Sequence, residues 1–181
     1  MKVTPTRLPG LLIVEPRVFE DQRGSFMESW NQQAFGAAGL AADFVQDNHS
    51  RSRRGVVRGL HYQLPNPQGK LVRVANGRVW DVAVDIRRSS PTFGQWVGVE
   101  LSGDNRRMLW IPEGFAHGFV TLQDDTDFLY KCTAAFDPSA DRAIRWDDPA
   151  LAIDWPLAGL DVSLSVRDLQ APLFGDAVLY E

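Results

Sequence analysis

Residues 79–86 read VWDVAVDI, and this alternating pattern is the clearest structural signal in the chain. Successive side chains of a β-strand point to opposite faces of its sheet. The even-numbered residues, all apolar, therefore share one face, and the odd-numbered ones, which include Asp81 and Asp85, share the other. We expect this stretch to be a strand with one of its two faces in the core.

The segment just before this strand has the signature of a tight turn. Residues 71–75 (LVRVA) are joined to Arg78 through Asn76-Gly77. This dipeptide suits a two-residue turn in which both residues have positive φ. The pattern predicts a β-hairpin made of residues 71–75 and 79–86.

The rest of the chain is also rich in short β-type runs. Those that follow lie at residues 96–101, 108–111, 118–122 and 128–136. Helical periodicity is confined to residues 32–40 and to a turn or two near 169–174. Many short strands predict a sandwich or barrel, and residues 147–156 are typical of an irregular tail packed on it.

Length and composition exclude several classes of protein. The chain has 181 residues, 44% apolar content and a net charge of −4. We therefore expect one domain over residues 1–181 without a basic surface for nucleic acid. Residues 1–10 lack the apolar stretch of a signal peptide, and no apolar run is long enough for a membrane helix. With Cys132 as its single cysteine, the protein is expected to be soluble and cytoplasmic.

Two polar segments could contain catalytic or binding residues. Residues 46–51 (QDNHSR) and 58–63 (RGLHYQ) bring two histidines, amides and arginines close together in sequence. A solvated loop and an edge strand would have a similar composition. Residues 111–119 (IPEGFAHGF) hold His117 between a proline and two glycines, which could aim the imidazole into a cavity or place it in an ordinary tight turn.

A metal site is a further possibility, because three histidines in a β-sandwich could bind Zn, Fe or Cu. The usual His-x-His pattern followed by Glu is absent, since Tyr62 and Gln63 follow His61. Tyr130 and Asp168 are typical of a core tyrosine and a solvated acid. Spacing alone does not connect either of them with His61.

Ordered blocks of residues carry a specific resemblance to a known family. The blocks are 21–28 (DQRGSFME), 44–50 (FVQDNHS), 58–63 (RGLHYQ), 69–74 (GKLVRV), 81–87 (DVAVDIR), 90–94 (SPTFG), 112–119 (PEGFAHGF) and 128–131 (FLYK). Together they resemble the dTDP-4-dehydrorhamnose 3,5-epimerase family over almost the whole chain. The resemblance implies an all-β, cupin-like jelly-roll β-sandwich with short peripheral helices.

The resemblance also implies an activity and its catalytic residues. The family converts dTDP-4-dehydro-6-deoxy-D-glucose into dTDP-4-dehydro-L-rhamnose through an enolate at C4. His61 would be the base, Asp168 its orienting partner, Lys70 the cation near the C4 oxygen and Tyr130 the proton donor. No metal or cofactor is implied, because the substrate's own ketone is the electron sink.

Substrate binding and assembly follow from the same resemblance. The residues assigned to the substrate are Arg23, Phe26, Glu28, Gln46, Asn48, Arg58, Gln63, His117, Asp141 and Arg167. In the family, the block at residues 21–28 reaches the nucleotide bound by a neighbouring subunit, which implies a homodimer.

Departures from the family pattern leave more than one function open. Asp141 and Arg167 replace a glutamate and a lysine, and Ala135 and Phe136 stand where relatives often have tyrosines. A lost phenol could restrict inversion to C3 or to C5 alone. The chain could also be a non-catalytic jelly roll that binds sugar nucleotides, or a metal-dependent cupin. The intact set of catalytic residues argues against a binding module.

Overall fold

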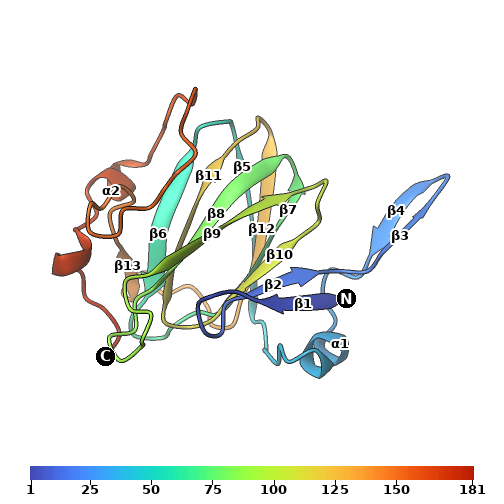
Figure 1. Cartoon of the computed structure of the whole chain (residues 1–181), viewed down its shortest axis with the longest axis horizontal. Coiled ribbons are helices and arrows are strands. Elements are labelled where there is room, and N and C mark those ends of the chain that lie inside the picture. Colours follow the sequence, from blue (N-terminus) through green and yellow to red (C-terminus); the bar gives the residue numbers. More distant parts are fainter.

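The computed structural model describes all 181 residues, and its body is formed by two antiparallel sheets packed face to face (Figure 1). In spatial order, the six-stranded sheet contains β1 (Lys2–Pro5), β2 (Leu12–Glu15), β10 (Met108–Ile111), β7 (Lys70–Asn76), β12 (Thr126–Cys132) and β5 (Gln46–Ser52). The five-stranded sheet contains β13 (Asp141–Ala143), β6 (Val57–Gln63), β11 (Phe115–Thr121), β8 (Arg78–Asp85) and β9 (Trp96–Ser102). The predicted all-β, cupin-like jelly-roll class is confirmed.

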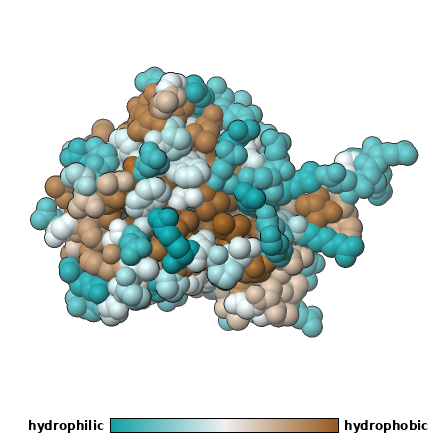
Figure 2. All heavy atoms as spheres, in the orientation of Figure 1, coloured by the Kyte–Doolittle hydropathy of each residue, from teal (hydrophilic) through white to brown (hydrophobic).

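Few elements lie outside these sheets. They are the hairpin β3 (Val18–Asp21) and β4 (Gly24–Met27), the helices α1 (Gln32–Ala37) and α2 (Val166–Leu169), and a 3-10 turn η1 (Phe174–Asp176). The hairpin stands away from the body of the molecule, and its tip is hydrophilic (Figures 1 and 2). None of the helices combines the length and apolar character that crossing a bilayer requires.

The predicted hairpin at Asn76-Gly77 is wrong. β7 pairs with β10 and β12, whereas β8 pairs with β11 and β9 in the other sheet. Asn76-Gly77 is therefore a corner at which the chain changes sheets. Gly77 has the expected positive φ of 82°, whereas Asn76 lacks the positive φ that the two-residue turn would require. A Cβ at Gly77 would lie 2.3 Å from Thr126 Oγ1. The sharp turn itself is present, but local turn preference does not determine which strands pair.

Both faces of β8 are buried, so the expectation of one core face is incomplete. Val79 and Ala83 point into the interior between the sheets. Val82 and Val84 lie on the opposite face, where the irregular C-terminal segment covers them with apolar side chains such as Trp155. Residues 147–156 pack on the sandwich as predicted, and they turn what would be a solvated face into a second core.

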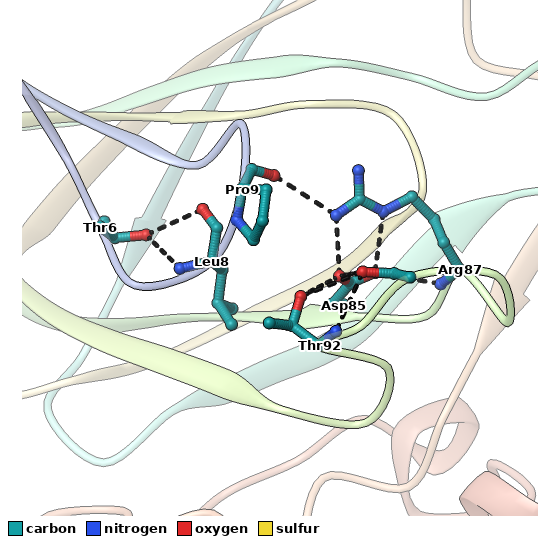
Figure 3. A network of polar contacts seen from close by, with 7 residues as sticks. Thr6, Leu8, Pro9, Asp85, Arg87 and Thr92 are labelled. Atoms are coloured by element: carbon teal, nitrogen blue, oxygen red, sulfur yellow. Dashed lines mark hydrogen bonds and ion pairs between the residues drawn. The ribbon is translucent and has the colours of Figure 1, made fainter.

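Asp85 connects the end of β8 with the N-terminal loop (Figure 3). Its carboxylate is fully buried and accepts hydrogen bonds from Arg87 Nε at 2.8 Å, Ser90 Oγ at 2.5 Å and Thr92 Oγ1 at 2.6 Å. Arg87 Nη2 also donates to the Pro9 carbonyl at 3.3 Å. Burial alone would raise the pKa of Asp85, but the hydrogen bonds from Arg87, Ser90 and Thr92 lower it to about 2.

This lowered pKa predicts how stability depends on pH. Replacing Asp85 with asparagine should lower the free energy of unfolding at pH 7 by on the order of 2 kcal/mol, because the ionised form has most of the favourable contacts. The stabilisation is present above the unfolded-state pKa and is lost as the pH falls from about 4 towards 2. Urea unfolding of both proteins at several pH values measures this. A difference that stays constant down to about pH 2 would contradict the assignment.

Candidate active site

A cavity of about 390 Å³ opens between the two sheets. The predicted site residues that line it are Gln46, Asn48, Arg58, His61, Gln63, Lys70, His117, Tyr130, Asp141 and Arg167. Asp168 lies behind His61, and Arg23, Phe26 and Glu28 lie elsewhere on the chain. Most of the predicted site residues therefore lie together, on strands of the two sheets and at the start of α2.

A β-bulge in β6 brings Arg58 and His61 to the same face. His117 of β11 is opposite His61, and Phe119 is opposite Arg58, so β6 has one residue more than β11 between these pairs. In a regular strand, side chains three positions apart point to opposite faces. The bulge contains Gly59, whose φ is 126° and whose added Cβ would lie 2.5 Å from Gly118 Cα. Only glycine fits there, and the cavity gains both a cation and an imidazole.

His61 and Asp168 form a close pair, although 107 positions separate them. His61 Nε2 lies 2.5 Å from Asp168 Oδ1. Ser165 caps α2 by accepting the Asp168 N–H at 3.1 Å, and its hydroxyl donates to Asp168 Oδ2 at 2.9 Å. Burial alone would raise the pKa of Asp168, but the hydrogen bonds from His61 and Ser165 hold it below its usual value. The ionised carboxylate can only accept, so Nε2 carries the hydrogen and Nδ1 is left to take a proton.

Lys70 and Tyr130 occupy the opposite wall of the cavity. They lie on neighbouring strands of the six-stranded sheet, where Cys132 pairs with Lys70 and Tyr130 is two residues from Cys132 on the same face. Lys70 is 8% exposed, and burial lowers the pKa of its ammonium. Burial raises the pKa of Tyr130, so its phenol keeps its proton at neutral pH. This wall therefore presents a cation and a proton donor to the imidazole on the facing sheet.

His117 is the second histidine of the cavity. It lies within β11, after the turn at residues 112–114, so its interpretation as an ordinary turn residue is wrong. Its Nε2 is 2.9 Å from Asp81 Oδ2, and burial lowers the pKa of its imidazole. His117 therefore stands in the cavity as a neutral, buried ring held by a carboxylate.

The polar side chains of β5 divide between the two faces of this edge strand. Gln46 and Asn48 face the cavity and bond to each other at 2.9 Å. His49 faces away and lies 2.9 Å from Asp127. Strand alternation along β5 thus turns His49 away from the cavity, so that of the histidines in the two polar segments His61 lines it and His49 does not.

Several predicted binding residues have protein partners of their own. Both donor positions of the Gln63 amide are used, because Nε2 donates to the carbonyls of Asn66 at 2.8 Å and Ala135 at 3.2 Å. Gln63 therefore shapes the loop that follows β12. Arg167 pairs with Asp141 at 2.7 Å, which orients its guanidinium beside the cavity.

The structure adds aromatic residues that the sequence prediction did not assign to the site. Phe119 and Phe128 stack with their ring centroids 4.1 Å apart on the cavity wall. Phe136 also lines the cavity and is 52% exposed. The backbone N–H of Phe136 donates to Gln46 Oε1 at 2.7 Å, which fixes the loop. Phe119 and Phe128 each lie two residues from a predicted site residue on the same strand, His117 and Tyr130 respectively, so strand alternation could have identified them. Phe136 lies in a loop, where no such alternation applies.

The hairpin β3–β4 does not reach the cavity of its own chain. Arg23 pairs with Asp21 at the hairpin tip, and Phe26 is 70% exposed. Glu28 follows directly after β4 and is also exposed. Phe26 and Arg23 instead line a separate hollow on the hairpin. No group of three or more His, Cys, Asp or Glu side chains is arranged to hold a metal ion.

Comparisons with known proteins identify close relatives of this chain. The family model described as dTDP-4-dehydrorhamnose 3,5-epimerase matches residues 5–176. A dTDP-4-dehydrorhamnose 3,5-epimerase from Salmonella typhimurium is 57% identical over the full length of both chains, and one from Pseudomonas aeruginosa is 57% identical over 98% of each. A crystal structure of dTDP-6-deoxy-D-glucose-3,5-epimerase from Legionella pneumophila, in complex with dTDP-4-keto-L-rhamnose, has a TM-score of 0.93 and 52% identity, covering 96% of this chain and 93% of that one.

Proposed function

Because this chain belongs to the dTDP-4-dehydrorhamnose 3,5-epimerase family, we propose that His61, Lys70 and Tyr130 carry out the reaction of that family in the cavity between its sheets. The chain is an isomerase that inverts C3 and C5 of dTDP-4-dehydro-6-deoxy-D-glucose to give dTDP-4-dehydro-L-rhamnose. The observation that carries the residue assignment is the placement of the His61–Asp168 pair and of Tyr130 on facing walls.

Each inversion needs three roles, and the cavity supplies a side chain for each. His61 Nδ1 takes the proton from the carbon beside the C4 ketone, and the electron pair moves onto the C4 oxygen. Lys70 opposes the negative charge that develops there, which lowers the barrier because this charge grows in the transition state. Tyr130 then gives its proton to the opposite face of the same carbon. Exchange with solvent removes the proton from His61 and restores that of Tyr130.

The remaining polar side chains suit a nucleoside diphosphate. Arg58 and Arg167 offer forked donors to phosphate oxygens, and Gln46 and Asn48 provide amides nearby. The half-exposed ring of Phe136 is available to stack on the thymine base. In this assignment Phe136 takes the stacking role within the chain's own cavity, and Asp141 holds Arg167 in place.

The hairpin residues fit a homodimer. Arg23, Phe26 and Glu28 project from the body on β3–β4 and cannot serve their own cavity, so we assign them to the nucleotide bound by a second copy. The exposed rings of Phe19 and Phe26 would be covered in such an arrangement. We further assign the whole of residues 1–181 to one catalytic domain that acts in the cytoplasm without metal or cofactor.

Deuterium incorporation tests the proposed function. When the enzyme, treated with EDTA, converts dTDP-4-dehydro-6-deoxy-D-glucose in D2O, we expect deuterium at both C3 and C5 of the product, measured by NMR. The solvent must supply both hydrogens, because Tyr130 and His61 exchange with water between proton transfers. Label at one carbon only would indicate a single-site epimerase. Product without label would exclude the enolate mechanism, and substrate incubated without enzyme gives the background exchange.

A further inference from the structure

The segment between β12 and β13, residues 133–140, brings Phe136 to the wall of the cavity. The segment contains no strand or helix, and Phe136 is 52% exposed. The ring of Phe136 belongs to none of the hydrophobic clusters that form the cores of the sandwich. Side-chain packing therefore does not hold this ring beside the cavity. Its position depends on the hydrogen bonds that the backbone of the segment makes with its neighbours.

Gln63 makes two of these hydrogen bonds, one on each side of Phe136. Its Nε2 donates to the Ala135 carbonyl at 3.2 Å, and its Oε1 accepts the Asp137 N–H at 2.8 Å. The second hydrogen of Nε2 goes to the Asn66 carbonyl at 2.8 Å, and Gln63 is only 2% exposed. A buried amide whose donors and acceptor are all bonded is held in one orientation. Gln63 therefore fixes the backbone directly before and directly after Phe136.

Two more glutamines bond to the same segment. Gln68 lies just before β7, and its Nε2 donates to the Ala134 carbonyl at 2.8 Å. Gln46 accepts the Phe136 N–H, as described above. Gln63 is the last residue of β6 in the five-stranded sheet, whereas Gln46 is the first residue of β5 in the six-stranded sheet. The segment is thus attached to both sheets of the sandwich.

These bonds argue against the direct contact between Gln63 and the substrate that the family resemblance implied. Both hydrogens of the Gln63 amide are donated to backbone carbonyls, and its oxygen accepts from Asp137. A substrate could take a hydrogen from Gln63 only by displacing a bond that shapes the protein. Any effect of Gln63 on substrate binding must therefore act through the segment that it holds.

We propose that Gln63 and Gln68 are positioning residues for the nucleotide, which hold residues 134–137 so that the ring of Phe136 is in place to stack on the thymine base. This inference rests on the stacking role proposed for Phe136. A segment that is fixed before the ligand arrives loses less conformational freedom on binding. Neither glutamine has a hydrogen bond to a group assigned to proton transfer, so the effect should fall on KM and leave kcat nearly unchanged.

A double-mutant cycle of Gln63→Met and Phe136→Ala tests this assignment through the dissociation constant of dTDP, measured by calorimetry. Methionine keeps the length of the glutamine side chain and removes its hydrogen bonds. Phe136→Ala should weaken dTDP binding by roughly 5- to 150-fold, as expected for the loss of a ring stacked on a base. Gln63→Met should weaken it by roughly three- to tenfold. In protein that already carries Phe136→Ala, Gln63→Met should change the affinity by less than about twofold.

Asn76→Leu is the matched control for Gln63→Met. The Asn76 amide donates to the Asp125 carbonyl at 2.9 Å, so it also holds a loop, but at the opposite end of β12 and outside the cavity. Its removal should leave dTDP binding unchanged. An equal loss of affinity from Gln63→Met with and without Phe136 would mean that Gln63 contacts the nucleotide directly, and it would overturn the proposal. If Gln63→Met did not fold, an unchanged affinity in Gln68→Met would overturn it.

Hydrogen exchange of the Asp137 amide, followed by NMR without ligand, provides a second readout. This amide should be protected in the unaltered enzyme and should exchange faster in Gln63→Met, while the amides of β11 keep their protection. Fast exchange in the unaltered enzyme would overturn the proposal. Unchanged dTDP affinity in Phe136→Ala would refute the stacking itself, whereas a weakened Phe136→Ala beside an unchanged Gln63→Met would refute only the glutamine assignment. Neither measurement needs turnover, so a failure of the proposed reaction would be seen separately.

Discussion

His61→Ala is expected to lower kcat by roughly 10²- to 10⁴-fold and to abolish deuterium incorporation at both C3 and C5. The reason is that the buried carboxylate of Asp168 holds one ring nitrogen of His61 and leaves the other free to act as the base. His117, the other histidine of the cavity, is held by Asp81 through one nitrogen, and burial lowers the pKa of its ring. Conversion measured by NMR in D2O gives both quantities.

His49→Ala is the matched control for this variant. His49 has the same ionisable ring and lies on a strand of the same sandwich, but it faces away from the cavity and contacts Asp127. Its removal should leave conversion and labelling unchanged. Label that still enters C3 or C5 in His61→Ala at the original rate would mean that another group is the base.

The catalytic pair shows what sequence patterns predict and what they do not. His61 stands out in a polar segment, but nothing in the spacing connects it with Asp168, 107 positions later. Their contact depends on how the C-terminal segment returns across the five-stranded sheet and on Ser165 capping a helix of one turn. Such long-range placement follows from packing of the whole chain. Only the family resemblance linked the two residues in advance.

Strand periodicity explains the placement of some of the site residues. Gln46 and Asn48, two residues apart on β5, share the cavity face, and the same period separates them from His49. Arg58 and His61 break the rule, because the bulge at Gly59 adds one residue to β6. A bulge changes the face of every later side chain in its strand, and a single sequence does not show where one occurs.

The corner at Asn76-Gly77 limits prediction in a different way. The dipeptide forces a sharp change of direction, and Gly77 has the positive φ that such a turn requires. Whether the two flanking strands then pair depends on their other neighbours. Here β7 is bonded on both edges by β10 and β12, so β8 must join the other sheet. This crossing places β7, which carries Lys70, and β8, which carries Asp81, in facing sheets.

Tyr130→Phe is expected to separate proton removal from inversion. The variant keeps the ring and loses only the hydroxyl, so His61 can still take a proton from the carbon beside the ketone and return one from solvent to the same face. Epimerised product should fall by roughly 10²- to 10⁴-fold, while recovered substrate still gains deuterium at C3 or C5. This outcome differs from that of His61→Ala, in which substrate and product both remain unlabelled.

Tyr62→Phe provides the comparison that makes this result specific. Tyr62 also borders the cavity, but its hydroxyl donates to the Val178 carbonyl at 2.6 Å, and burial raises its pKa to about 12. Loss of that hydrogen bond should cost about 1 kcal/mol of folding free energy and leave inversion intact. If Tyr130→Phe inverted C3 and C5 as fast as the unaltered enzyme, the proton would have to reach the far face from another donor. The six-stranded wall would then contribute only the charge of Lys70 to the reaction.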